Sequence, residues 1–145
     1  MVAAVIRIYP SNEQSFTGSG YGTLPDAISC EITEELNGAY LLELTYPGGG
    51  HNADKLALRN IIYVKANPYG NPDAFRITRI EKDIAGELAV SAQHVSYDLH
   101  GIPIAPYSAT GVVAALAGLS SNSLTTNPFM GRGSFFRLVL TWYMA

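Results

Sequence analysis

The sequence predicts a mainly β fold with a short helix: a small β-barrel of bent strands, followed by the helical start of a second domain. Two hairpin patterns share one design, each with a glycine at the third position of a three-residue loop, 36–38 and 84–86. Inside the second hairpin the apolar residues shift phase by one position, which indicates a β-bulge. An uncharged run rich in alanine and valine over 111–119 then predicts the helix.

The first hairpin pattern spans 24–46, with residue 35 facing residue 39. Gly38 is expected to be the left-handed residue that follows a type I turn and closes the loop. This register places Ile32 opposite Leu42, so that apolar side chains share one face. A two-residue turn at 37–38 would place Ile32 opposite Glu43 and divide the apolar residues between the two faces. The three-residue loop is therefore the preferred interpretation.

The second hairpin pattern has the same construction around Gly86, which sets Ile80 opposite Val90. Before that point the apolar positions are odd-numbered, as at Ile77, whereas Ile80 and Val90 are even-numbered. One extra residue near 78–79 restores the phase and bends the strand. Because such bends help sheets close on themselves, a small barrel is favoured over a flat sheet.

Shorter elements fill the rest of the first domain. A loop rich in serine, glycine and asparagine holds Phe16 as its one large anchor. The others follow from turn residues and short apolar runs: strands over 5–9 and 61–66, a helical turn within 54–60, and a turn over 67–73.

The domain boundary is expected around residue 105, where two prolines break the strand pattern. Residues 1–105 would form the β-barrel domain, and 106–145 the helix and the start of a truncated or divergent second domain. Ser108 or Thr110 is expected to cap the helix over 111–119. A helix without charge on any side is expected to be buried, inside a larger domain or between subunits.

Composition excludes several classes of protein. Charged residues make up 14% of the 145 residues, against a typical ~25%, which indicates surfaces covered by other subunits. With a net charge of −3 and a pI of about 5.5, no basic footprint for nucleic acid is present. No apolar stretch approaches the ~18 residues of a membrane span. The N-terminus lacks the basic region of a signal peptide.

The single cysteine, Cys30, excludes a disulfide within the chain. The hairpin register places it opposite Leu44 on the apolar face of its strand. It is therefore interpreted as a small buried hydrophobic residue.

The densest polar group lies over 94–100. In an extended strand the side chains of His94, Ser96, Asp98 and His100 would share one face. A zinc site usually needs three or four converging ligands, and catalytic triads are assembled from distant segments, so structural hydrogen bonding is preferred. No catalytic, metal-binding or cofactor-binding residue is assigned.

Several segments in a fixed order carry a family resemblance: Ile8-Tyr9, Gly22–Ala27, Cys30–Pro47, Phe75-Arg76-Ile77, Ala92–Leu99 and Thr126–Phe129. Their order and spacing resemble the N-terminal region of phage and prophage tail-tip proteins, often labelled prophage tail endopeptidase or phage minor structural protein. The resemblance covers roughly residues 5–129. Family proteins continue for hundreds of residues, whereas 130–145 does not look like their expected continuation.

The resemblance implies a tail-hub fold, in which small β-barrels form a trimeric ring at the end of the tail tube. Family members join the tube and the distal tail protein to fibres or receptor-binding parts, and some carry a cell-wall-degrading domain far downstream. By this resemblance the chain is expected at the virion tail tip, and in the bacterial cytoplasm during assembly. Its partners would be other tail proteins, with no nucleic acid, membrane span or cofactor.

Three function classes remain open at this stage. The first is a structural tail-tip module that binds protein neighbours, in which Gly38 and Gly86 serve only as structural turns. The second is a peptidase or cell-wall hydrolase, whose candidate nucleophile or ligand residues are Cys30, His94, Asp98 and His100. The third is a small carbohydrate-binding module, to which exposed tyrosines would contribute stacking surfaces.

Overall fold

The computed structural model describes residues 5–67 and 69–125. Contacts within the chain divide it into two compact units, 1–95 and 96–145, and each is described by itself. The prediction of a mainly β fold is confirmed. The domain boundary near residue 105 stays a prediction, and the expectations for 126–145 lie outside the described residues.

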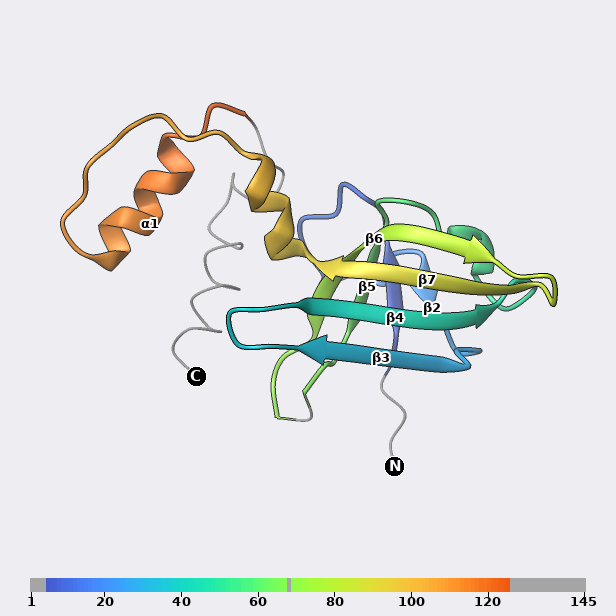
Figure 1. The fold of residues 1–145 in the computed structure, drawn as a ribbon. Coiled ribbons are helices and arrows are strands. Elements are labelled where there is room, and N and C mark those ends of the chain that lie inside the picture. Colours follow the sequence, from blue (N-terminus) through green and yellow to red (C-terminus); the bar gives the residue numbers. More distant parts are fainter. Residues whose placement is uncertain (1–4, 68, 126–145) are drawn as a thin grey trace. The chain divides into compact units, whose positions relative to one another are not determined.

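Seven strands and three helical segments make up the described chain (Figure 1). In chain order they are β1 (Arg7–Tyr9), β2 (Gly22–Thr23), β3 (Ser29–Glu34), β4 (Tyr40–Pro47), the 3-10 helix η1 (Ala53–Lys55), β5 (Ile61–Val64), β6 (Asp73–Lys82), β7 (Glu87–His94), the 3-10 helix η2 (Val95–Gly101) and α1 (Val112–Ser121).

The seven strands form one antiparallel sheet in the order β2-β1-β5-β6-β7-β4-β3. The two edge strands, β2 and β3, follow each other in the chain and are joined by residues 24–28. A connection of this length reaches at most ~20 Å, so the sheet curls until its edges approach at one end. The result is a curled half-barrel, with β3, β4 and β7 in front of β1 and β2 in Figure 1.

The first hairpin has the predicted register. Ile32 pairs with Leu42, and the N–H of Glu35 donates to the carbonyl oxygen of Ala39 at 2.8 Å. Cys30 likewise pairs with Leu44. The loop is therefore three residues long, and the apolar side chains share the inner face.

The left-handed residue of this loop is Asn37, with φ 59°, and not Gly38 as the sequence predicted. Asparagine tolerates this conformation because its short side chain makes local hydrogen bonds. Gly38 is needed for a different reason: a Cβ at this position would lie 2.8 Å from Cβ of Glu35. The glycine thus allows a close approach within the turn.

The second hairpin follows the prediction in both turn and register. Gly86 is left-handed, with φ 88°, and the N–H of Asp83 donates to the carbonyl oxygen of Glu87 at 2.9 Å. Ile80 pairs with Val90. The expected bulge is also present, since the register shifts by one residue between Ile77 and Arg79.

The core lies on the inner face of the half-barrel. Large side chains from five of the strands are almost fully enclosed there: Ile8, Leu42, Leu44, Tyr46, Ile62, Phe75, Ile77 and Val90. Along β4 the buried positions are the even-numbered ones, which is the period of two that the sequence pattern predicted.

A second, smaller packed region covers the outer face of β1 and β5. The loop over 10–21 folds back so that Phe16 stacks on Tyr63, with ring centroids 4.8 Å apart, and meets Tyr9 edge-on. The hydroxyl of Tyr9 donates to the carbonyl oxygen of Gly18 at 2.6 Å. The prediction that Phe16 anchors this loop is confirmed.

The connection between β4 and β5 is hydrogen-bonded to the segment that joins the two sheet edges. The N–H of His51 donates to Oδ2 of Asp26 at 2.7 Å, and the Tyr46 hydroxyl donates to the carbonyl oxygen of His51 at 2.6 Å. The side-chain amide of Asn52 donates to the carbonyl oxygen of Thr23. These bonds hold the curl of the sheet in place at one end.

In the second unit the predicted helix is present as α1. Its first turn is capped by neither Ser108 nor Thr110, because the N-cap position falls on Gly111, with φ 92° and no side-chain hydrogen bond. The valines that open the helix, Val112 and Val113, are 72% and 76% exposed. Burial of the helix is thus absent within the described chain, and burial between subunits stays a prediction.

Tyr107 fixes the segment that precedes α1. Its hydroxyl donates to the carbonyl oxygen of Ala115, and its ring lies directly over Gly118, where an added Cβ would come within 2.1 Å of a ring carbon. The small residue inside the helix is therefore explained by the tyrosine packed on it.

Candidate interaction surface

The polar residues over 94–100 do not all lie on one strand. Strand β7 ends at His94, and residues from Val95 onwards form the 3-10 helix η2. The segment over 94–100 is therefore not extended, so the condition under which its polar side chains would share one face is not met. With three residues per 3-10 turn, Asp98 and His100 do not share a face.

His94 is a core residue of the sheet unit. Its ring stacks on Tyr40 with centroids 4.6 Å apart and meets Phe75 edge-on at 5.7 Å. Burial lowers the pKa of His94 to about 4, so the imidazole is neutral at neutral pH. This environment, against the rings of Tyr40 and Phe75, is that of an aromatic packing residue.

Cys30 lies half-buried on the edge strand β3. Burial raises the pKa of its thiol to about 11, so the reactive thiolate is a minor form at neutral pH. Cys30 shares a row of the sheet with Leu44 and Val90. His94 is four residues further along β7, ~13 Å away at the rise of a β-strand. The two candidates of the hydrolase hypothesis therefore do not meet.

Within residues 5–67 and 69–125, no group of three or more His, Cys, Asp or Glu side chains is placed to hold a metal ion. Most tyrosines of the sheet unit are not free to stack on a ligand: Tyr9, Tyr40 and Tyr46 are buried and Tyr63 packs against Phe16, whereas Tyr21 is 43% exposed. Tyr69 is the strongly exposed exception, on the loop between β5 and β6.

A hydrogen bond links two loops at one end of the sheet. The hydroxyl of Tyr40, beside the 35–39 turn, donates to Oδ2 of Asp73 at 3.0 Å. Burial raises the pKa of the Asp73 carboxyl, and the bond from Tyr40 partly opposes that rise. Burial also raises the pKa of Tyr40, and the nearby negative charge adds to the effect. The pair holds the first hairpin against the start of β6.

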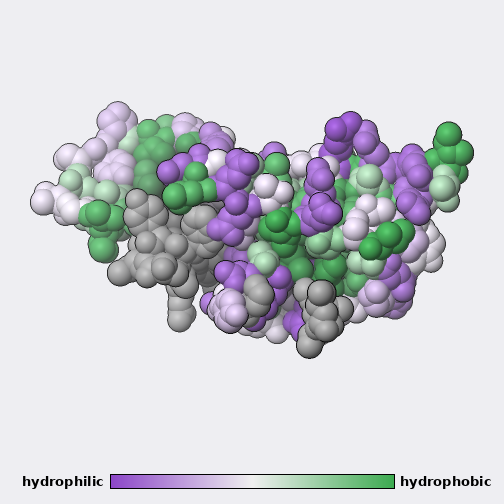
Figure 2. Space-filling model, turned by 60° about the horizontal axis from the view of Figure 1, so that its bottom comes forward, coloured by the Kyte–Doolittle hydropathy of each residue, from purple (hydrophilic) through white to green (hydrophobic). Residues whose placement is uncertain are grey.

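Large apolar side chains protrude from three loops of the sheet unit. Leu36 and Tyr69 are 86% and 97% exposed, and they lie on the two loops that the Tyr40–Asp73 bond connects. Ile84 is fully exposed on the turn between β6 and β7, where apolar atoms stand out at the tip in Figure 2. Single exposed apolar residues are common on protein surfaces, so these three side chains do not by themselves mark a contact site.

The charges of the sheet unit are unevenly distributed. Between Arg7 and Lys55 the sequence contains no lysine or arginine but seven acidic residues. On the outer face of the first hairpin, Glu31 and Glu43 are directly opposite each other and both are exposed. Like charges in such a pair repel. The hairpin β3–β4 is therefore an acidic surface.

Strand β3 is the long edge of the sheet. It pairs with β4 on one side, and among the described residues no strand pairs with it on the other. Six residues in regular register leave the free edge straight, without a bulge, proline or lysine to block pairing. This edge and the adjoining acidic face of the β3–β4 hairpin form the candidate interaction surface.

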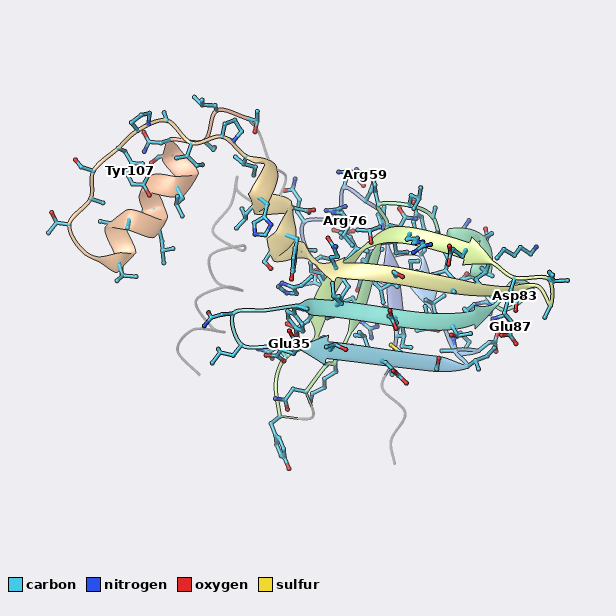
Figure 3. All side chains as sticks on the ribbon, in the orientation of Figure 1. Glu35, Arg59, Arg76, Asp83, Glu87 and Tyr107 are labelled. Carbon is cyan, nitrogen blue, oxygen red and sulfur yellow. The ribbon has the colours of Figure 1, made fainter. Side chains whose placement is uncertain are left out.

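Arg76 is a structural residue that the sequence patterns did not identify. Although charged, it is buried in β6, and its guanidinium donates to the carbonyl oxygens of Ser11 and Arg59 at 3.1 and 2.7 Å (Figure 3). Arg59 itself is left-handed, with φ 72°. The one local indication was an arginine placed between the apolar residues Phe75 and Ile77.

Comparison with known proteins found no matching protein family, no matching curated protein and no matching solved structure. In the part of the chain that the structure describes, no helix combines the length and apolar character needed to cross a bilayer.

Proposed function

We propose that this chain is a structural module of a phage or prophage tail tip, which joins the tail tube to distal tail and receptor-binding parts. In this role it binds protein neighbours, catalyses no reaction and needs no cofactor. Three copies form a ring at the tail tip, and the chain resides in the bacterial cytoplasm until the particle is assembled.

One observation carries the proposal: the residues behind the tail-tip resemblance are the ones that build the sheet. The longest matching segment, Cys30–Pro47, coincides with the hairpin β3–β4. The segment Phe75-Arg76-Ile77 is buried throughout, and His94 packs in the core. A scaffold requires this pattern, whereas an enzyme would be expected to place its shared residues around an open site.

A particle experiment tests the proposal directly. The prophage or phage that encodes the chain is grown with and without its gene, and particles are purified. We expect mass spectrometry to detect the chain in wild-type tails and immunogold labels to lie at the tail tip. Deletion should give particles without functional tips that fail to adsorb. Fully infectious particles from the deletion would overturn the proposal.

The hydrolase alternative is tested on the purified chain with peptidoglycan and peptide substrates, with and without added zinc. We expect no cleavage, because the Cys30 thiol is protonated and His94 is enclosed in the core. Cleavage that Cys30→Ser or His100→Ala abolishes, while circular dichroism shows an intact fold, would make the chain an enzyme. Light scattering of the same sample tests for the trimer.

A further inference from the structure

We propose that the free edge of β3 binds an extended segment of another protein, in which apolar residues alternate with lysine or arginine. This inference refines the proposed function by naming the chemistry of one partner, and it rests on that function only in taking the partner to be a protein. Backbone geometry, side-chain pattern and charge each support it.

The backbone of β3 presents hydrogen-bonding groups on its free side. Glu35 forms a hydrogen-bonded pair with Ala39, and such pairs alternate along an antiparallel ladder. The odd-numbered residues of β3 therefore bond to β4, and the N–H and C=O groups of Cys30, Ile32 and Glu34 point to the free edge. An incoming strand would pair with these groups.

The side chains of β3 favour a partner strand in which apolar and polar residues alternate. Cys30 and Ile32 lie on the inner face but are only half-buried, because none of the described strands pairs with the other side of β3. Ile28, just before the strand, is 57% exposed. Apolar residues of an added strand would extend the core over these side chains. On its other face the strand would lie beside Glu31 and Thr33.

Charge determines which residues the partner should carry on that outer face. Glu31 already faces Glu43 across the hairpin, and a lysine or arginine on the next strand would offset this repulsion. The surrounding segment supplies no basic residue of its own between Arg7 and Lys55. A second copy pairing through its own β3 would instead bring another Glu31 to the same face.

Synthetic peptides test the inference on the full chain. The probe is a capped Thr-Lys-Val-Lys-Ile-Lys-Thr heptapeptide, and the control has the same composition with its lysines consecutive. We expect the alternating peptide to bind at least about tenfold more tightly by fluorescence anisotropy. In NMR spectra its binding should shift the amide signals of Cys30, Ile32 and Glu34 more than those of the interior strand β4.

Two variants localise the binding. Ile32→Pro removes an N–H that points to the free edge and leaves the bonds to β4 in place, so the alternating peptide should no longer bind. Glu31→Lys should weaken that peptide about tenfold and favour a peptide with glutamate in place of lysine. Because this second substitution is on an exposed position, it remains informative if Ile32→Pro destabilises the fold.

The control is Glu81→Lys, which makes the same charge change on an exposed position of β6, away from the edge, and also removes the ion pair of Glu81 with Arg79. It should leave peptide affinity unchanged. Equal binding of both peptides, or equal effects of Glu31→Lys and Glu81→Lys, would overturn the proposal. So would self-association in light scattering that Glu31→Lys alters, since the occupant would then be a second copy.

The outcome is independent of the particle experiment. If the chain is found at the tail tip but neither peptide binds, the inference about β3 fails and the proposed function stands. If the alternating peptide binds at β3 but the chain is absent from tails, the edge inference stands and the tail assignment fails.

Discussion

The turns at 35–39 and 83–87 close hairpins of the same loop length at opposite ends of the sheet (Figure 3), yet different residues adopt the left-handed conformation. In the first turn it is Asn37, and in the second it is Gly86. Both hairpins nevertheless keep their inward-facing pairs in register. The register therefore follows from the apolar pattern of the strands, and the turn residues adjust to it.

The two hairpins also differ in how deeply their inward-facing side chains are buried. Leu42 in the first hairpin is fully buried. Ile80 in the second is only half-buried, near the end of β6 that extends beyond its pairing with β5. Leu42→Ala should therefore lower the free energy of unfolding by about 3 kcal/mol, and Ile80→Ala by about 1 kcal/mol. Urea titrations followed by circular dichroism measure both. Equal losses would contradict the difference in depth.

Acid should act on the end of the sheet that holds the first turn. The folded pKa of His94, about 4, lies below the ordinary value of 6.5, so the unfolded chain gains a proton that the folded chain does not. Stability contributed by the neutral imidazole is thus lost as pH falls from about 6.5 to about 4, by about 3 kcal/mol. The raised pKa of Asp73 acts in the opposite direction, because the folded chain then gains a proton more readily than the unfolded chain.

The measurement is urea unfolding at pH 7 and pH 4.5, with His94→Phe as the control that keeps an aromatic ring beside Tyr40 but cannot titrate. We expect the variant to lose less stability in acid than the wild type. Hydrogen exchange should also rise first near Tyr40 and not at the 83–87 turn. A variant with the same acid sensitivity as the wild type would exclude His94 as the cause.

Substitutions at Asn37 and Gly86 test how much each turn depends on a residue with positive φ. Gly86→Ala should lower the free energy of unfolding by about 1 kcal/mol, and Gly86→Asn by less, because asparagine tolerates positive φ. Asn37→Ala should also cost about 1 kcal/mol, whereas Asn37→Gly should be nearly neutral. Thermal melts of the four variants give the comparison, and a neutral Gly86→Ala would show that positive φ is not required there.

The smallest effect concerns the acidic residue at the start of each turn. Asp83 accepts a hydrogen bond from the N–H of Glu87 at 2.9 Å, whereas the corresponding bond from Ala39 to the carboxylate of Glu35 is long, at 3.4 Å. Asp83→Ala should lower stability by about 1 kcal/mol and Glu35→Ala by less than about 0.5 kcal/mol. The reverse order in chemical denaturation would contradict these geometries.

Local patterns were sufficient to predict the two hairpins, because a period of two and a turn residue are both contained within about ten residues of sequence. The bulge between Ile77 and Arg79 was also predictable, since it leaves a shift in the apolar phase. The helix α1 was predicted, but its N-cap was not, because both candidates, Ser108 and Thr110, precede the observed N-cap residue, Gly111.

The remaining features depend on distant parts of the chain. The buried Arg76 binds carbonyl groups of Ser11 and Arg59, which no local pattern connects with β6. Whether the polar residues over 94–100 share a face was not predictable locally, because alternating polar residues occur both in strands and in 3-10 helices such as η2. The charge imbalance that defines the β3–β4 surface was readable from the sequence, but its place on a free edge was not.

The position of β7 between β6 and β4 has a consequence for how the chain folds. Each hairpin is local and can close within about 1–10 μs, whereas pairing Leu44 with Val90 must enclose the long segment between them. The rate-limiting event is therefore expected to be the pairing of β4 with β7, which brings the two preformed hairpins together. Substitutions where β4 pairs with β7 should slow refolding, whereas substitutions in the turns should mainly change the unfolding rate.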